Sequence, residues 1–375
     1  MNAIRAAARP VPFVIPDFDL APLLVIWETT QSCGLACRHC RASAQLGRHP
    51  EELTTDEGRH LIDAVADMGT PLLILSGGDP LNRPDLGVLV AHGKARGLRM
   101  ATIPAATEQL RYDRLAELKA AGLDQIAFSL EFPRADLHDG FRGVPGAFER
   151  TLEAAGWDRR LGLPLQINTT VCGETAPYLE EMARFVEDLG IVFWEVFFLV
   201  PMGRGTLLRG LSADECERIF EVLWRAESRG RFVLKVTEAP HYRRWVTQHL
   251  AAAGGRAAAC PTVLHAPIGL SPKAVNSGKG FLFVSHRGEV FPSGFLPLLA
   301  GNVRENDLAA TYRHSACFRE LRDPGRLKGR CGRCEFRASC GGSRSRAYAL
   351  RGDPAATDPW CAYKPAAATE AKWRA

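Results

Sequence analysis

The chain has 375 residues, of which 46% are hydrophobic and 24% charged, and its net charge at pH 7 is only +5. This near-average globular composition excludes wholesale disorder, and the small charge excess gives no argument for nucleic-acid binding. No apolar run approaches the roughly 18 residues that cross a bilayer, and the first residues show no signal-peptide pattern. We therefore expect a cytoplasmic protein that binds neither nucleic acid nor membrane.

Between residues 20 and 235, short apolar runs alternate with amphipathic stretches. Each run is rich in Val, Ile, Leu or Phe, as expected for strands buried on both faces. Thr54 or Thr55, and later Ser212, are the expected N-caps of two helices. Six β/α units with right-handed crossovers predict a parallel sheet, open or curled into part of a barrel. The strands are expected at 23–28, 72–76, 98–103, 125–130, 165–171 and 193–200, and the helices at 55–68, 85–96, 112–121, 146–161, 177–189 and 212–229.

After residue 230 this rhythm breaks. Residues 281–285 and 290–291, around Arg287 and Gly288, predict a hairpin. From Leu327 onward the chain is rich in Cys, Gly and Arg and has little apolar periodicity. Such a segment cannot build its own core, so we expect it to be ordered by a metal.

Cysteine is the unusual feature of the composition. There are eleven, an odd number, and without a secretion signal a disulfide framework is a poor explanation. Clustered thiols in a reducing compartment usually hold metal. The two groups are Cys33, Cys37 and Cys40, and then Cys331, Cys334 and Cys340 with Cys361 following.

The first group is a CxxxCxxC motif in the loop after the first predicted strand. Catalytic loops of β/α proteins lie at that end of the strands. Three thiolates can hold three irons of a 4Fe–4S cluster and leave the fourth iron open to a small molecule. The alternatives are a zinc site or a set of unrelated core thiols.

With this motif the sequence resembles the radical SAM superfamily, whose cluster binds S-adenosylmethionine (SAM). The resemblance implies a partial (β/α)6 TIM-like barrel, and it implies SAM contacts in the segments that match the family's other motifs. Asp79 stands where the family usually has Glu, and Glu131, after Ser129, stands where it usually has Asp. A structural hydrogen bond is the alternative role of Asn168. The implied SAM contacts are Gly77, Gly78, Asp79, Ser129 and Asn168.

The second cysteine group resembles the C-terminal SPASM or twitch extension of radical SAM enzymes, which houses auxiliary clusters. Ser293 and Arg344 stand where two further cysteines would be expected, and none lies shortly after Gly301. The resemblance therefore implies one auxiliary 4Fe–4S cluster. A tetrahedral zinc site is the alternative. The implied ligands are Cys331, Cys334, Cys340 and Cys361.

The resemblance also implies the chemistry. One electron, from a donor such as flavodoxin or ferredoxin, would cleave SAM to methionine and a 5′-deoxyadenosyl radical, which abstracts hydrogen from a small-molecule or peptide substrate. His241 and Tyr242 are candidate catalytic residues, as a proton donor or an iron ligand, with arginines following that could pair carboxylates. A solvated surface loop is the alternative reading of that segment.

For the substrate, the sequence is most similar to the tetrapyrrole branch, the enzymes of heme d1 biosynthesis and the heme decarboxylases. Those enzymes act on propionate side chains, which suits local arginines. A maturase of ribosomally made peptides is the second hypothesis, although the 32 residues before Cys33 are too few for a leader-binding domain. A non-catalytic iron–sulfur or zinc scaffold is the third.

The expected organisation has five parts. They are an N-terminal extension (1–20), the radical SAM barrel (21–235), a bridging region (236–280), the SPASM/twitch-like extension (281–365) and a tail (366–375).

Overall fold

The computed structural model describes residues 15–252 and 274–366. In these ranges ten strands form one sheet, in the order β10-β9-β8-β1-β2-β3-β4-β5-β6-β7. All neighbours from β8 through β1 to β7 are parallel, and only the β8–β9 and β9–β10 pairs are antiparallel. The strands are β1 (Leu24–Glu28), β2 (Leu72–Ser76), β3 (Arg99–Thr102), β4 (Gln125–Ser129), β5 (Leu165–Val171), β6 (Phe193–Phe198), β7 (Val233–Thr237), β8 (Phe281–Val284), β9 (Glu289–Phe291) and β10 (Gly301–Asn302).

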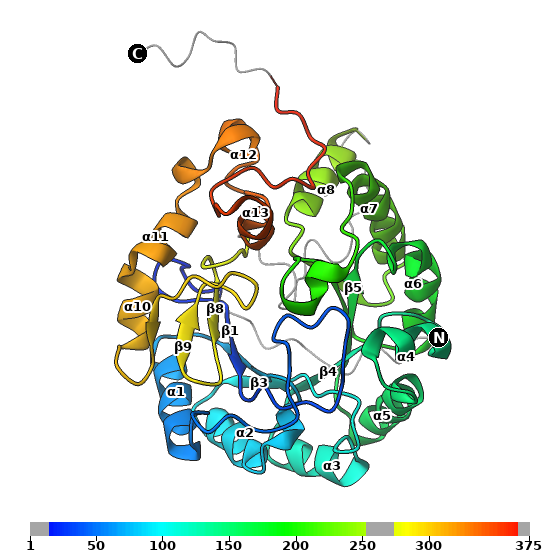
Figure 1. Cartoon of the computed structure of the whole chain (residues 1–375), viewed down its shortest axis with the longest axis vertical. Helices are drawn as coiled ribbons and strands as arrows, with labels where there is room; N and C mark the ends of the chain where they lie inside the picture. Colours follow the sequence, from blue (N-terminus) through cyan, green and yellow to red (C-terminus); the bar gives the residue numbers. More distant parts are fainter. Residues whose placement is uncertain (1–14, 253–273, 367–375) are drawn as a thin grey trace.

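Helices surround this sheet on its outer side, and the long loop after β1 crosses the middle of the view (Figure 1). The helices α10 to α13 and the C-terminal loop form the extension at the left and top of the view. The helices are α1 (Thr55–Asp67), α2 (Leu86–Ala95), α3 (Tyr112–Ala120), α4 (Ala135–Arg142), α5 (Ala147–Leu161), α6 (Leu179–Asp188), α7 (Ala213–Ser228), α8 (His241–Ala252), α10 (Leu308–His314), α11 (Ala316–Arg322), α12 (Gly329–Arg333) and α13 (Arg344–Arg351).

The six predicted strands and six predicted helices are confirmed, within a few residues at their ends. Both predicted caps exist: Thr54 and Ser212 each form a capping box with the glutamate three residues later. Several elements were not predicted: α4, β7, α8, β10 and α10 to α13. Strand β7 carries polar residues on its inner face, and α4 is too short to show a clear helical period.

The predicted hairpin is also confirmed, but its first strand has a second role. Strand β8 pairs in parallel with β1 from Leu24–Phe281 to Trp27–Val284, so the hairpin extends the barrel sheet. The barrel and the start of the extension therefore share one sheet.

The alternation of side chains along each strand separates two environments. On β1, Val25 and Trp27 face the helices and are fully buried in the main core. Their neighbours Leu24 and Ile26 face the inside of the curved sheet, where a cavity remains. The inner face of the sheet is therefore where a site can form.

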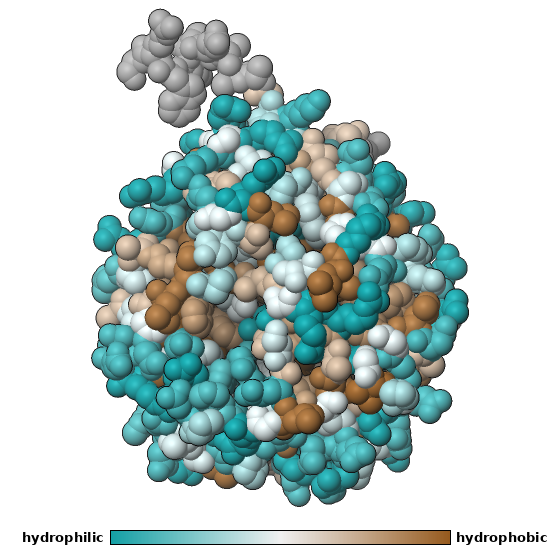
Figure 2. All heavy atoms as spheres, viewed as in Figure 1, coloured by the Kyte–Doolittle hydropathy of each residue, from teal (hydrophilic) through white to brown (hydrophobic). Residues whose placement is uncertain are grey.

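Hydrophilic residues cover most of the outer helices on the face shown in Figure 2. Within the described ranges, no helix combines the length and the apolar character that a membrane-crossing helix needs.

Asp158, in α5, is a buried carboxylate whose two side-chain oxygens have no hydrogen-bond partner. Burial raises its pKa to about 8, against about 3.9 in an unfolded chain. Between these two values the unfolded state loses the proton while the folded state keeps it, so stability falls as pH rises. We expect Asp158→Asn to raise the melting temperature over wild type by an amount that grows from pH 5 to pH 8.

Thermal unfolding followed by circular dichroism checks this expectation. The same change at the exposed Asp188 of α6 is the control, and its difference from wild type should not grow with pH. A difference at position 158 that stays constant across this range would show that the buried carboxyl does not titrate as stated.

Candidate active site

The first three cysteines lie in the loop after β1 and line one cavity of about 1090 Å³, here called the cluster cavity. Arg204, from the loop after β6, holds this segment: its Nε donates to the Cys37 carbonyl at 2.8 Å and its backbone N–H to the Cys40 carbonyl at 3.0 Å. Burial raises the pKa of the Cys33 thiol to about 11. Buried thiolates need a cationic partner, and the irons of a cluster would supply one.

The two glycines after β2 are required by the backbone of the cysteine loop. A Cβ on Gly77 would lie 2.5 Å from the Thr30 carbonyl oxygen, and one on Gly78 would lie 2.4 Å from that of Ser32. The Gly78 N–H instead donates to the Thr30 carbonyl at 2.7 Å. Only residues without a side chain permit this approach, which places both glycines in the wall of the cluster cavity.

The SAM contact of Asp79 stays a prediction, and its carboxylate has structural partners. Its carboxylate is fully buried and accepts hydrogen bonds from the Thr107 hydroxyl (2.5 Å) and the backbone N–H groups of Leu81 and Ala105 (3.1 and 3.3 Å). It therefore points into the protein rather than into the cluster cavity. It fixes the loops after β2 and β3, which carry the cavity wall.

Ser129 and Asn168 are brought together as predicted. They are partners in the β4–β5 ladder and both line the cluster cavity. The Asn168 Oδ1 accepts a hydrogen bond from Gln166 Nε2 at 2.7 Å, so this amide also has a structural partner.

The sequence analysis missed a charged group beside the cysteines. Glu131 lines the cluster cavity and lies 3.4 Å from His39 Nε2 and 3.5 Å from Arg142 Nη1, with its other oxygen accepting from the Thr170 N–H at 2.6 Å. Burial raises the pKa of Glu131 to about 7. Arg142 is buried and interacts electrostatically with the cysteines, Cys37 most strongly. The signal in the sequence that could have identified Glu131 is that it stands where the family usually has Asp.

A second space of about 1570 Å³ occupies the inside of the curved sheet and is here called the central cavity. Ile103, Phe197 and Phe295 line both this space and the cluster cavity. The two cavities are therefore neighbours that share a wall. A substrate in the central cavity would lie next to a ligand of the cluster.

The structure separates the two predicted catalytic residues, which both belong to α8. His241 is fully buried against the Phe220 ring, and burial lowers its pKa to about 3. It is neutral, does not reach either cavity, and its role as proton donor is corrected on that ground. Tyr242 does line the central cavity, but its hydroxyl donates to Glu227 at 3.0 Å. The loop reading is also wrong, because both residues are buried in a helix.

Buried charges join the extension to the barrel near this helix. Arg346 and Asp358 are both fully buried and bonded at 2.9 and 2.7 Å. Arg346 also donates to the backbone carbonyl of Glu238, after β7, and the Glu238 carboxylate accepts from the hydroxyls of Ser343 and Ser345. Removing one partner of such a pair costs about 3–5 kcal/mol. This network fixes α13 against the residues that follow β7.

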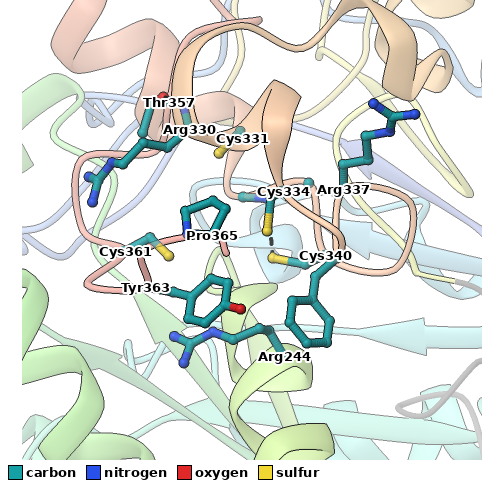
Figure 3. A pocket seen from close by; sticks show the side chains of 13 residues that line it. Arg244, Arg330, Cys331, Cys334, Arg337, Cys340, Thr357, Cys361, Tyr363 and Pro365 are labelled. Carbon is teal, nitrogen blue, oxygen red and sulfur yellow. Dashed lines mark hydrogen bonds between the residues drawn. The ribbon is translucent and has the colours of Figure 1, made fainter. Parts of the chain in front are cut away.

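The four cysteines of the second group also come together. Figure 3 shows their sulfur atoms turned toward one space, with Arg244 and Tyr363 at its edge. The space measures about 410 Å³. Arg244 is ion-paired with Glu217 of α7, which ties the edge of this space to the barrel. The four residues are Cys331, Cys334, Cys340 and Cys361.

The four thiols that line this space could serve a 4Fe–4S cluster or a tetrahedral zinc ion. A tetrahedral zinc site needs every sulfur within about 2.3 Å of one metal, whereas a 4Fe–4S cluster takes each thiolate on a different iron.

The positions that lack the further cysteines are occupied by buried polar groups. Arg344 donates to the carbonyls of Gly342, Pro354 and Ala356, and Ser293 accepts from the Phe295 N–H. These contacts agree with a single auxiliary cluster.

Three clustered thiols after a parallel strand line a cavity that also has glycines in its wall and a second cavity beside it, and this arrangement defines a class of protein. It is a cluster-dependent enzyme in which one iron is left open for a small ligand beside the substrate space.

Comparison with known proteins gives the same class. Residues 27–186 match the family model of the radical SAM superfamily. An AdoMet-dependent heme synthase of Methanosarcina barkeri is 41% identical over 345 residues, covering 92% of this chain and 97% of that protein. The pre-heme d1 synthase of Dinoroseobacter shibae (90% and 85% covered) and a PqqA peptide cyclase of Bradyrhizobium diazoefficiens (92% and 87% covered) are each 32% identical.

The fold has solved counterparts. The structure of Streptococcus suis SuiB bound to S-adenosylmethionine superimposes with a TM-score of 0.70 at 14% identity, covering 92% of this chain and 78% of that one. The chain belongs to the radical SAM superfamily, in the branch that contains the AdoMet-dependent heme synthases. With its cluster and SAM bound, such an enzyme cleaves SAM reductively and uses the resulting radical to abstract hydrogen from an organic substrate.

Replacing Cys33, Cys37 and Cys40 together by Ala should abolish SAM cleavage and leave roughly four iron atoms per chain, because the second cysteine group is separate from the first. Iron and zinc analysis of the anaerobically reconstituted protein, with a 5′-deoxyadenosine assay, measures both. The wild type should hold roughly eight irons. A triple variant that holds zinc and no iron would overturn the auxiliary cluster.

Proposed function

We propose that the substrate is a tetrapyrrole with propionate side chains and that the enzyme removes carbon dioxide from at least one of them. The observation that carries the proposal is the 41% identity to an AdoMet-dependent heme synthase across 97% of that protein. The central cavity supports it, since Ile103, Phe197 and Phe295 line both this space and the cluster cavity, so that a substrate there lies beside the cluster site.

The lining of the central cavity also suits such a ligand. Inner residues of β1 to β3, among them Leu24 and Ile74, make one wall apolar, while Gln166, Glu195 and Lys235 add polar groups to the wall formed by β5 to β7. An amphipathic macrocycle with carboxylates at its edge matches both walls.

The proposed reaction balances with one electron left over. Abstraction of one hydrogen atom from the propionate chain, followed by loss of carbon dioxide, forms a vinyl group and releases one electron to an acceptor. The four cysteines of the second group would complete the coordination of their cluster. This leaves electron transfer or ordering of the extension as the roles of that site. A flavodoxin or a ferredoxin is the proposed source of the electron that cleaves SAM.

The test is anaerobic 5′-deoxyadenosine formation by the reconstituted enzyme with iron-coproporphyrin or a sirohaem-derived tetrapyrrole. We expect a substrate-dependent rise and a product that has lost carbon dioxide and two hydrogen atoms per reacted propionate. A precursor peptide of the PqqA type is the comparison substrate. If 5′-deoxyadenosine formation rises with the peptide and with no tetrapyrrole, the protein is a peptide-maturing enzyme and the tetrapyrrole proposal is wrong.

A further inference from the structure

The polar wall of the central cavity is a row of side chains that crosses four neighbouring strands. It consists of Gln125 (β4), Gln166 (β5), Glu195 (β6) and Lys235 (β7), all lining the cavity. Glu195 is directly opposite Lys235 in the β6–β7 ladder. Polar residues on the inner face of a parallel sheet are uncommon, because such strands are usually apolar on both faces.

Hydrogen bonds hold this row in place. Gln125 Nε2 donates to Gln166 Oε1 at 2.7 Å, and Gln166 Nε2 donates to Glu195 Oε2 at 2.8 Å. The other oxygen of Glu195 accepts from Lys235 Nζ at 2.8 Å and from the Thr237 hydroxyl at 2.7 Å. Both oxygens of Glu195 therefore have partners within the protein.

Lys235 differs from the rest of the row because it can still donate hydrogen bonds to a ligand. Its ammonium group has three N–H donors, and the contact with Glu195 uses one of them. The side chain is 22% exposed, although Glu195 beside it is only 7% exposed. Glu195 fixes the position of the ammonium group, and the remaining donors are available to an anion in the cavity.

The position of Lys235 relative to the cluster cavity limits which anion it can hold. Asn168, which lines the cluster cavity, is opposite Glu195 in the ladder, and Lys235 is one strand further. The backbones of strands two spacings apart are about 10 Å apart. A group bound at Lys235 is therefore not the group that lies at Asn168 beside the cluster cavity.

We propose that Lys235 binds a substrate carboxylate that does not react, while the apolar body of the substrate lies against the inner residues of β1 to β3. This inference rests on the proposed function and names the anchoring group of the same site. Arg243, which also lines the cavity from α8, adds a second positive charge to the same region. Lys235 is thus a specificity-determining residue, because it requires a carboxylate at a fixed distance from the reacting one.

The experiment measures binding of iron-coproporphyrin and of its tetramethyl ester to the reconstituted enzyme, by absorption titration. In wild type the acid should bind at least tenfold more tightly than the ester, since a charge-assisted hydrogen bond is lost with the ester. Lys235→Met should weaken binding of the acid by at least tenfold and leave binding of the ester within about threefold. Lys235→Arg should recover part of the affinity for the acid.

Two further variants separate the charge from structural damage. Lys235→Met combined with Glu195→Gln removes the ion pair without leaving a buried unpaired carboxylate, and it should bind the acid as poorly as Lys235→Met. Lys94→Met is the matched control, because Lys94 has the same 2.8 Å ion pair, with Asp124, outside the cavity. It should bind the acid as wild type does, and iron content confirms that each variant is loaded.

The outcomes distinguish this inference from the proposed function. A wild type that turns over a tetrapyrrole but binds acid and ester equally would leave the function standing and overturn the role of Lys235. So would a double variant that binds the acid as wild type does. A wild type that neither binds nor turns over any tetrapyrrole would remove the proposed function and the inference together.

Discussion

The close contact between two backbone segments is the constraint on which the site depends. The loop after β2 lies against the loop after β1, so that the N–H groups of Gly78 and Asp79 donate to the carbonyls of Thr30 and Ser32. A side chain at Gly77 or Gly78 would collide with these carbonyl oxygens. Because the same loop after β1 carries the three cysteines, this contact fixes the distance between the cluster ligands and the opposite wall of the cluster cavity. The buried Asp79 carboxylate adds the loop after β3 to the same assembly.

The extension is held to the barrel by a different kind of interaction. Its first strand continues the sheet, and its last helix is fixed by the buried pair of Arg346 and Asp358 and by the contacts of Glu238 with Ser343 and Ser345. Glu238 has a left-handed backbone (φ +59°), which only well-determined surroundings maintain in a residue other than glycine. Burying charges is costly unless each has a partner, and here each one does. This arrangement fixes α13, and with it the segment that carries the second cysteine group, against the residues that follow β7.

The two cavities have different linings and therefore suit different ligands. The cluster cavity gathers thiols, glycines and the buried Glu131, whereas the central cavity offers an apolar wall and a polar wall. Shared residues such as Phe197 and Phe295 form the boundary. A ligand on one side is therefore presented to a substrate on the other, and the charged row through Glu195 and Lys235 gives the substrate side its preference for an anion.

The sequence by itself determined the parallel β/α architecture, both cysteine groups, the glycine pair and the caps at Thr54 and Ser212. These features are local: strand and helix periods, capping boxes and ligand spacing are all readable over a few residues. Only the tertiary structure decided which polar side chains face a cavity. His241 and Tyr242 are neighbours in sequence, yet one is buried against Phe220 and the other lines the central cavity. Likewise Glu195 and Lys235, 40 positions apart, become partners only through the register of β6 and β7. Such pairings depend on long-range strand register and helix packing, which no short stretch of the chain encodes.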